Sequence, residues 1–257
     1  MDDILIFADS KQAHNKILRK VLKRLENIGM TLNEQKTQIC VEEIQFVGHI
    51  INKDGIRPDK SKVAAIVNLE APTDQKELLR FLGMVNFVGR YIPNKADIME
   101  PLNCLLTSKN AWIWDTPQEE AFNKIKELLT RAPSLAHYDC TKPTFISADA
   151  SSYGLGCVLL QEQDDKRRRP VAYASRTLTS AERRYAQIER EALAFTYACE
   201  KFSEYITGLH VEIETDHKPL IPIFSTKHLD DLSPRLQRSR IRMMCTHITL
   251  FTVLGKN

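Results

Sequence analysis

A helical pattern between residues 185 and 206 constrains the fold of this chain more than any other feature. Strand patterns stand on both sides of it, at residues 145–149, 156–160 and 171–174 before it and 211–216 after it. An apolar-faced helix among strands predicts an α/β domain in which the helix packs against a sheet. The apolar residues of the helix recur at alternating steps of three and four: Tyr185, Ile188, Ala192, Phe195, Cys199, Phe202 and Ile206.

A shorter α+β pattern opens the chain. Strands are expected at residues 4–7, 30–32 and 44–51, and a helix is expected at residues 12–28. The turn signal Asn52-Lys53-Asp54-Gly55 closes the pattern. The order is that of a β-α-β-β unit.

A small helical unit is expected at residues 58–108, where short apolar runs recur at helical spacing. Thr116-Pro117-Gln118-Glu119 has the form of a capping box with proline at the first helical position, so a helix should open there. Thr179-Ser180-Ala181-Glu182 is a second such box, which predicts the start of the long helix. A last strand is expected at residues 248–254.

Composition restricts the class of protein. The 36 basic and 33 acidic residues give a net charge of +3, which permits a nucleic-acid partner without requiring one. The six cysteines form no C-x-x-C pair, so reduced thiols are favoured over disulfides or a zinc site. No apolar run approaches the ~18 residues of a membrane span, and no secretion signal opens the chain. We expect an intracellular protein, cytoplasmic or nuclear, without a membrane anchor.

Three carboxylates are candidates for a shared metal site. Asp149 and Asp216 each end a predicted strand, and Glu191 lies about 40° from Phe195 around the helix, at the edge of the apolar face. Two Mg²⁺ or Mn²⁺ ions about 4 Å apart can activate water and stabilise the departing oxygen during phosphodiester hydrolysis. Such hard cations need oxygen ligands. Each acid alone also fits an ordinary role as a turn, capping or solvated residue.

The motifs around these acids, taken together, resemble the ribonuclease H domain of gypsy-type LTR retrotransposon Pol polyproteins. Upstream, the chain resembles the reverse transcriptase of the same family. The segments that match ribonuclease H are Ile146-Ser147-Ala148-Asp149-Ala150-Ser151, Glu189-Arg190-Glu191-Ala192-Leu193-Ala194 and Thr215-Asp216-His217-Lys218-Pro219-Leu220. The segments that match reverse transcriptase are Asp2-Asp3, Leu32-Asn33-Glu34-Gln35-Lys36 and Phe46-Val47-Gly48-His49-Ile50.

This resemblance implies a division of the chain. Residues 1–55 would be a truncated reverse-transcriptase palm, 56–110 a thumb-like helical subdomain and 111–140 a connection. Residues 141–257 would be a ribonuclease H-like domain, a mixed five-stranded sheet with flanking helices that is truncated at its C-terminus. The fold class is therefore α/β, preceded by an α+β palm remnant.

The resemblance also implies the chemistry. The family copies RNA into DNA and uses two divalent ions to hydrolyse RNA in RNA–DNA hybrids. Asp149, Glu191 and Asp216 match three of its four nuclease acids, and the fourth would follow Gly255-Lys256-Asn257. Asp2-Asp3 matches the acid pair of the polymerase motif, so these two residues are candidate metal ligands.

Because part of each site is missing, we expect lost polymerase activity and weak nuclease activity. A catalytically inactive nucleic-acid-binding remnant is the alternative. A hydrolase with a serine nucleophile is disfavoured, since no G-x-S-x-G motif occurs.

Several other residues are candidates for contacts with an RNA–DNA hybrid or another nucleic acid. Lys166-Arg167-Arg168-Arg169 lies between two predicted hairpin strands, where it could contact phosphates or form a solvated turn. His217 could assist substrate handling or simply bond to backbone. Trp112, Trp114 and Tyr138 could stack on bases, although packing is favoured.

Overall fold

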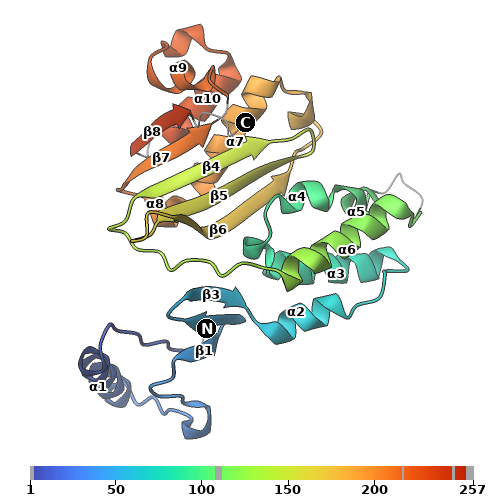
Figure 1. Cartoon of the computed structure of the whole chain (residues 1–257). Helices are drawn as coiled ribbons and strands as arrows, with labels where there is room; N and C mark the ends of the chain where they lie inside the picture. The colour runs from blue at the N-terminus through green and yellow to red at the C-terminus, as the bar shows by residue number, and fades with distance from the viewer. Residues whose placement is uncertain (1–2, 108–111, 216, 245–246, 253–257) are drawn as a thin grey trace.

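The computed structural model describes residues 3–107, 112–215, 217–244 and 247–252. Its largest element is a five-stranded mixed sheet with the order β6-β5-β4-β7-β8 (Figure 1). The predicted α/β fold class is thereby confirmed. The strands are β4 (Thr144–Ala150), β5 (Gly154–Glu162), β6 (Arg168–Thr177), β7 (His210–Thr215) and β8 (His247–Thr252).

The connections of this sheet change direction at its central strand, β4. On one side β4, β5 and β6 form an antiparallel meander, and on the other side β7 and β8 run parallel to β4. The β4–β7 pairing ends at Ser147 and Glu214, whereas the β4–β5 pairing continues to Ala150 and Leu155. A crevice at the carboxyl ends of parallel strands is expected where connections diverge in this way.

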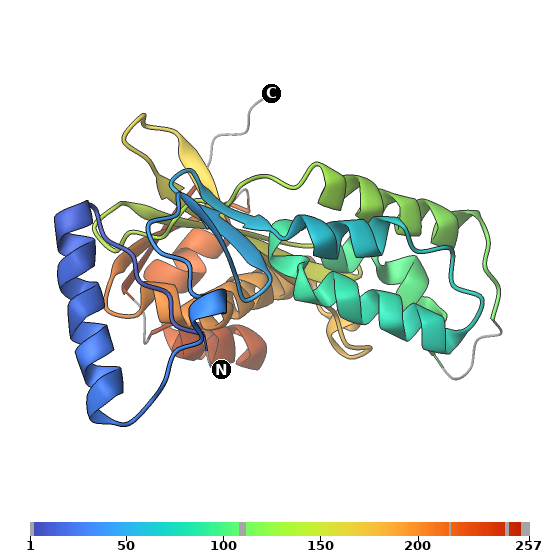
Figure 2. The ribbon, with the colours of Figure 1, turned by 90° about the horizontal axis from the view of Figure 1, so that it is seen from below.

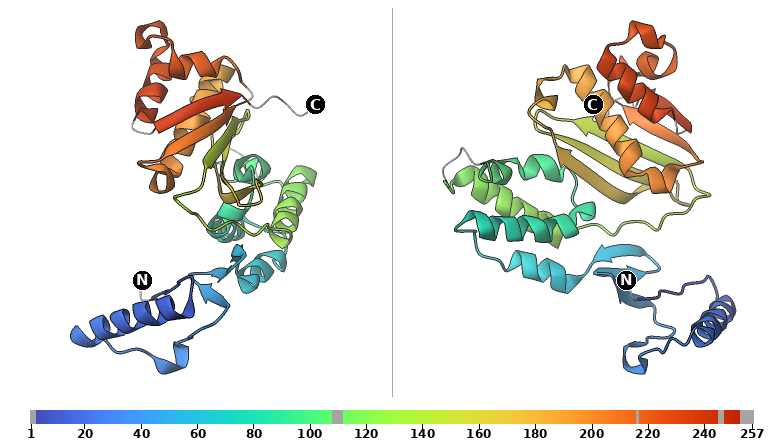
Figure 3. Two further views of the ribbon diagram at one scale, coloured as in Figure 1. Left: turned by 60° about the vertical axis from the view of Figure 1, so that its left-hand side comes forward. Right: turned by 180° about the vertical axis from the view of Figure 1, so that it is seen from behind.

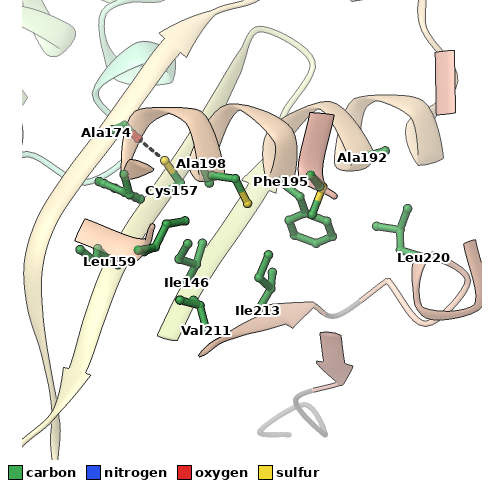
Figure 4. Close-up of a cluster of buried hydrophobic side chains, with 14 of the residues drawn as sticks. Ile146, Cys157, Leu159, Ala174, Ala192, Phe195, Ala198, Val211, Ile213 and Leu220 are labelled. Carbon is green, nitrogen blue, oxygen red and sulfur yellow. Dashed lines mark hydrogen bonds between the residues drawn. The ribbon is translucent and has the colours of Figure 1, made fainter. Parts of the chain in front are cut away.

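Helix α7 (Gln187–Lys201) covers one face of the sheet, with α10 (Pro234–Met243) beside it (Figures 1 and 3). The apolar stripe of α7 carries this packing, as its periodicity predicts. Figure 4 shows Phe195 pointing toward the strands, where it is fully buried, as are Ile146 and Ile213. Short helices α8 (Ser203–Ile206) and α9 (Leu220–Ser225) complete this domain.

A second hydrophobic core lies in the helical unit beside β6 (Figure 1). Its largest buried side chains include Phe81, Phe122 and Tyr91, and the Phe81 and Phe122 rings pack with centroids 4.7 Å apart. The helices are α2 (Lys60–Val67), α3 (Gln75–Phe87), α4 (Lys95–Ile98), α5 (Glu100–Cys104) and α6 (Thr116–Thr130), with the 3-10 turn η2 (Gly89–Tyr91). Because α6 shares this core, residues 116–130 belong to the same helical unit.

A small antiparallel sheet precedes the helical unit. It consists of β1 (Glu43–Phe46), β2 (His49–Asn52) and β3 (Gly55–Pro58). The turn signal at 52–55 is confirmed, since it joins β2 to β3. Strand β3 was not predicted, because four residues that include a glycine and a proline give little strand signal.

The N-terminal helix α1 (Lys11–Asn27) stands apart from both cores, as Figure 2 shows. It matches the predicted helix, and Gly29 follows it with a φ of +71°, the left-handed conformation of a C-terminal cap. Of its apolar residues only Leu25 is buried, whereas Ile17 and Leu22 are exposed.

Two predicted strands are wrong. Residues 4–7 and 30–32 are extended or irregular and belong to neither described sheet, and Phe7 is 81% exposed. An extended apolar segment becomes a strand only when another strand completes its hydrogen-bond ladder. Both segments have strand propensity but no such partner among the described residues.

A helical turn starts near each of the two predicted capping boxes, but neither prediction gives the correct starting residue of the helix. Asp115, rather than Thr116, caps α6 in a capping box with Gln118. The predicted box of Thr179 and Glu182 forms its hydrogen bonds but opens only the 3-10 turn η3 (Glu182–Arg184). Since Tyr185 is extended, α7 begins at Gln187 instead.

The sequence also predicts no membrane span and reduced thiols. None of the helices described here is both long and apolar enough to cross a membrane. All five described cysteines are free thiols. Burial raises the pKa of Cys157 and Cys199 to about 12 each, so both thiols are protonated and unreactive at neutral pH.

The central role of Phe195 yields a stability prediction. Phe195→Ala should lower the free energy of unfolding by about 3–5 kcal/mol, because it removes a fully buried ring and leaves a cavity between α7 and the strands. Urea unfolding followed by circular dichroism measures the change. Phe87→Ala is the control, since Phe87 is 51% exposed and its loss should cost much less. Equal losses would contradict the assignment of this core.

Candidate carboxylate site at the end of β4

Asp149 lies at the carboxyl end of β4, beyond the last residue that pairs with β7. Its neighbours Ala148 and Ala150 pack toward α7. Side chains alternate along a strand, so Asp149 stands on the opposite face, at the rim of the sheet. It is exposed, and its Oδ1 accepts a hydrogen bond from the backbone N–H of Ala150 at 2.9 Å. The carboxylate is thus accessible to an ion.

Glu191 comes to the same strand end from α7. It is only 4% exposed, which is unusual for a carboxylate. Nε2 of Gln187, one helical turn earlier, donates to Glu191 Oε1 at 2.5 Å and to the backbone oxygen of Ala150 at 3.3 Å. One amide therefore joins Glu191 to the residue that follows Asp149.

A second helix residue fastens the turn after β4. Arg190 donates from one guanidinium nitrogen to the backbone oxygen of Ser151 at 3.1 Å, and from the other to the side chain of Gln187. The sequence pattern assigned no role to Gln187, and none to Arg190 although Arg190 lies in a segment that resembles the family. The only signal for Gln187 was its position four residues before Glu191, where side chains on a helix meet.

The segment that leads into α7 is held by an ion pair. Arg176 of β6 donates to both carboxylate oxygens of Glu182, each at 2.8 Å. This pair of hydrogen bonds lowers the pKa of Glu182 to about 2 against the opposing effect of burial. The bidentate geometry fixes the approach to the helix that carries Glu191.

The described donors fit a hard divalent cation in type. Carboxylates and backbone carbonyl oxygens are the ligands that Mg²⁺ and Mn²⁺ prefer. Within the described ranges, no three His, Cys, Asp or Glu residues gather as a metal site. The third predicted acid, Asp216, lies outside the described residues.

The other predicted metal ligands are at the N-terminus. Asp2 lies outside the described residues, and Asp3 is exposed.

The predicted cationic run lies at the other end of the sheet from Asp149. Lys166 and Arg167 lie in the turn between β5 and β6, and Arg168 and Arg169 begin β6. This is the end at which β4 begins, roughly 17 Å from Asp149 at about 3.3–3.4 Å per residue. Lys166 pairs with Glu162 at 2.9 Å, Arg169 with Asp165 at 3.0 Å, and Arg168 with Glu214. The arrangement resembles a solvated hairpin more than an open phosphate patch.

The remaining candidates are held by protein contacts. The backbone N–H of His217 donates to Thr215 Oγ1 at 3.0 Å. Trp114 stacks with Trp112 and donates from Nε1 to Glu119 at 2.7 Å. Tyr138 packs edge-on against Tyr205. Packing, the favoured interpretation of these three aromatic residues, is confirmed by these contacts.

The segment Phe46-Val47-Gly48-His49-Ile50, which resembles the reverse-transcriptase family, contains the β1–β2 turn. Val47 and Gly48 both have positive φ, +48° and +75°, and a side chain at Gly48 would meet the Phe87 ring at 2.5 Å. The His49 ring stacks on Phe87, and its Nδ1 lies 2.8 Å from the Tyr91 hydroxyl. Burial, and then the charge of Arg90, lower the pKa of His49. The hairpin is therefore fixed on the helical unit by a neutral histidine.

Comparison with known proteins agrees with this architecture. A model described as an RNase H-like domain found in reverse transcriptase matches residues 114–213, and one described as reverse transcriptase (RNA-dependent DNA polymerase) matches residues 1–51. The retrovirus-related Pol polyprotein from transposon 297 of Drosophila melanogaster is 34% identical over 257 residues. The chain is therefore similar to the reverse-transcriptase and ribonuclease H-like parts of retrotransposon Pol polyproteins.

The chain spans about a quarter or less of the length of these relatives. The match covers 100% of this chain and 24% of the transposon 297 polyprotein. The transposon Tf2-3 polyprotein of Schizosaccharomyces pombe is 33% identical, over 86% of this chain and 17% of its own length.

Solved structures support the fold of the chain. The foamy viral protease-reverse transcriptase dRH in complex with double-stranded DNA superposes with a TM-score of 0.80 at 22% identity, over 98% of this chain and 44% of that chain. The same viral protein with an RNA/DNA hybrid gives 0.79 at 23% identity, over 98% and 34%. At these identities the likeness concerns the fold.

The Arg176–Glu182 pair predicts a pH dependence. Because the pKa of Glu182 is depressed in the folded state, its contribution is present above the unfolded pKa of about 4.3 and is lost as the pH falls through about 2. Glu182→Gln should lower the free energy of unfolding by about 1–2 kcal/mol at pH 7. The difference from the unchanged chain should shrink below pH ~4.5.

Urea unfolding of both forms at several pH values tests this dependence. Glu127→Gln is the matched control, since Glu127 forms an exposed pair with Arg131 on α6. Water and salt screen such an exposed pair, so Glu127→Gln should change the free energy of unfolding much less than Glu182→Gln does. A Glu182→Gln effect that stays constant down to pH 2 would contradict the assignment.

Proposed function

We propose that the carboxyl end of β4 is a two-metal site that hydrolyses the RNA strand of RNA–DNA hybrids. The observation that carries the proposal is the shared contact of Gln187 with Glu191 and Ala150, because it brings a buried carboxylate to the strand end that presents Asp149. An acid held near a strand end by an amide has its direction fixed before an ion arrives.

Asp216 is the third ligand of the proposed site. The parallel pairing of β4 and β7 supports it, because Ser147 pairs with Glu214. Asp149 is two residues after Ser147, and Asp216 is two residues after Glu214.

Divalent Mg²⁺ or Mn²⁺ would supply the charge that activates water and stabilises the departing oxygen. Asp149, Glu191 and Asp216 would hold the ions. Gln187 orients Glu191, and Arg190 fixes the turn beyond Asp149. The nucleic-acid complexes of the foamy viral structures motivate the choice of an RNA–DNA hybrid as substrate.

A nucleic-acid-binding segment without catalysis is the second candidate. Asp149 is exposed and the cationic run is ion-paired, and neither observation decides between a nuclease and a passive binder. A nuclease responds to divalent ions, whereas a passive binder responds mainly to salt.

Four finer assignments belong to the same proposal. We assign the segment to the gypsy type of LTR retrotransposon on its motif residues. Its division is palm-derived to residue 55, thumb-like to 110, connecting to 140 and ribonuclease H-like beyond. Asp2 and Asp3 would be the polymerase acids. Free thiols favour an intracellular location.

The first test replaces one metal ligand without changing its size. Asp149→Asn should reduce Mn²⁺-dependent cleavage of a labelled RNA–DNA hybrid to background, because it removes a negative ligand. Electron paramagnetic resonance of free Mn²⁺ should show a parallel loss of binding. Asp54→Asn is the control, since Asp54 is an exposed acid in the β2–β3 turn. Cleavage that survives Asp149→Asn would reject the nuclease function.

The second test concerns the cationic run. Replacing Lys166, Arg167, Arg168 and Arg169 by alanine should change the salt dependence of hybrid binding by less than about one phosphate contact, a slope change of about 0.9. Three of these cations are paired with acids, so few phosphates are neutralised by them. Filter binding over a range of salt concentrations measures the slope. A loss of three or four contacts would establish the run as a nucleic-acid surface.

A further inference from the structure

The start of α4, in the helical unit, lies against the strands beside the carboxylate site. The backbone N–H of Ala96 donates to Ser175 Oγ of β6 at 3.0 Å. A Cβ placed on Gly154 would lie 2.9 Å from Ala96 Cβ and 3.0 Å from Asp97 Oδ1. A Cβ on Gly156 would lie 2.7 Å from Asn94 Oδ1. Two glycines of β5 therefore allow the helical unit to approach the sheet at this point.

This contact is on the same face of the sheet as Asp149. Gly156 is the direct cross-strand partner of Asp149 in the β4–β5 pairing. Residues directly opposite each other in an antiparallel pair have their side chains on the same face, about 5 Å apart at Cβ. Asn94 thus lies one strand away from the exposed carboxylate, and Asp97 follows it on α4.

Asp97 makes the most specific contact of this joint. Its Oδ1 accepts a hydrogen bond from Ser151 Oγ at 2.5 Å, across 54 residues of sequence. The same Oγ accepts from the backbone N–H groups of Tyr153 and Gly154 at 3.0 and 2.8 Å. A hydroxyl has one hydrogen to donate and two lone pairs, so all three hydrogen-bonding positions of Ser151 are filled.

Ser151 is held from both sides of the sheet. Asp97 binds its hydroxyl from the helical unit, while Arg190 binds its backbone oxygen from α7. Asp149 is two residues before Ser151, and Glu191 is the residue after Arg190. A displacement of Ser151 therefore moves the strand end that carries one acid relative to the helix that carries the other.

We propose that Asp97 is a positioning residue of the carboxylate site, through which the thumb-like helical unit fixes the turn after Asp149. This inference rests on the proposed function, because it concerns the same acids. Its consequence is that the metal affinity of the ribonuclease H-like part depends on a side chain of the reverse-transcriptase part. Residues that orient metal ligands from outside the coordination sphere typically contribute about 10–100-fold to affinity.

The test compares Asp97→Ala with Asp97→Asn in the full chain. Asp97→Ala removes the closer acceptor for Ser151 Oγ and leaves only the backbone oxygen of Gly154 at 3.3 Å, within the turn itself. Mn²⁺ binding should therefore weaken about tenfold, measured by the resonance of free Mn²⁺. Amide hydrogen exchange at Tyr153 and Gly154 should become faster in the same variant. Asp97→Asn keeps an acceptor oxygen and should restore both readouts to within about twofold. Ser151→Ala should match Asp97→Ala, and the double variant should be no worse than either.

Asp139→Ala is the matched control. Asp139 Oδ1 accepts from the hydroxyl and the backbone N–H of Thr141 at 2.7 and 2.9 Å, just before β4 begins. The variant loses the same kind of hydrogen bond at the opposite end of the strand, so Mn²⁺ affinity should not change. Thermal unfolding of every variant establishes that each is folded.

Each outcome separates the two proposals. If the unchanged chain shows no Mn²⁺ binding that Asp149→Asn removes, the proposed function fails and this inference fails with it. If that binding exists and Asp97→Ala retains it at full strength, only the positioning role of Asp97 is overturned. If Asp97→Asn is as weak as Asp97→Ala, the hydrogen bond to Ser151 is not the cause.

Discussion

The packing of α7 on the five-stranded sheet is the interaction on which the rest of the structure depends. Burial of Phe195 and its neighbours fixes the rotation of the helix, because the stripe has only one apolar side. Glu191 lies at the edge of that stripe and is carried to the end of β4. The same hydrophobic contact that stabilises the domain thus decides where a buried acid is placed. Gln187 and Arg190 refine that placement with hydrogen bonds.

The sequence predicted what local periodicity controls. Patterns that a few neighbouring residues specify predict the apolar stripe of α7 and the strands of the large sheet. They also predict the helical turns that follow the two capping boxes. Residues 4–7 show the limit of such patterns, since a strand also requires a partner. Helix α10 shows another limit, because its arginines obscure the two apolar residues, Leu236 and Met243, that are buried. Glu191 was identified from its angle around the helix, which is a local property.

The joint at α4 has no local signature. Asp97 contacts Ser151 across 54 residues, and nothing in the sequence around Asp97 marks it as different from other surface acids. Gly154 and Gly156 leave room for Ala96 and Asn94, and this role depends on the three-dimensional approach of a separate unit. The domain division and the site residues drawn from family resemblance therefore remain predictions, while the fold and its retrotransposon relatives are established.

The order of strands in the large sheet has a consequence for how the chain acquires its structure. Strands β4, β5 and β6 are consecutive and antiparallel, so they can associate as soon as they leave the ribosome. Strand β7 must return to β4 over a long stretch of chain, since the paired residues Thr144 and Val211 are 67 positions apart in the sequence. The last strand, β8, closes the edge only when residues near 250 have been synthesised. During translation the growing edge of β4 is therefore unpaired, and this interval is when the nascent chain is most open to capture by chaperones or to association with other strands.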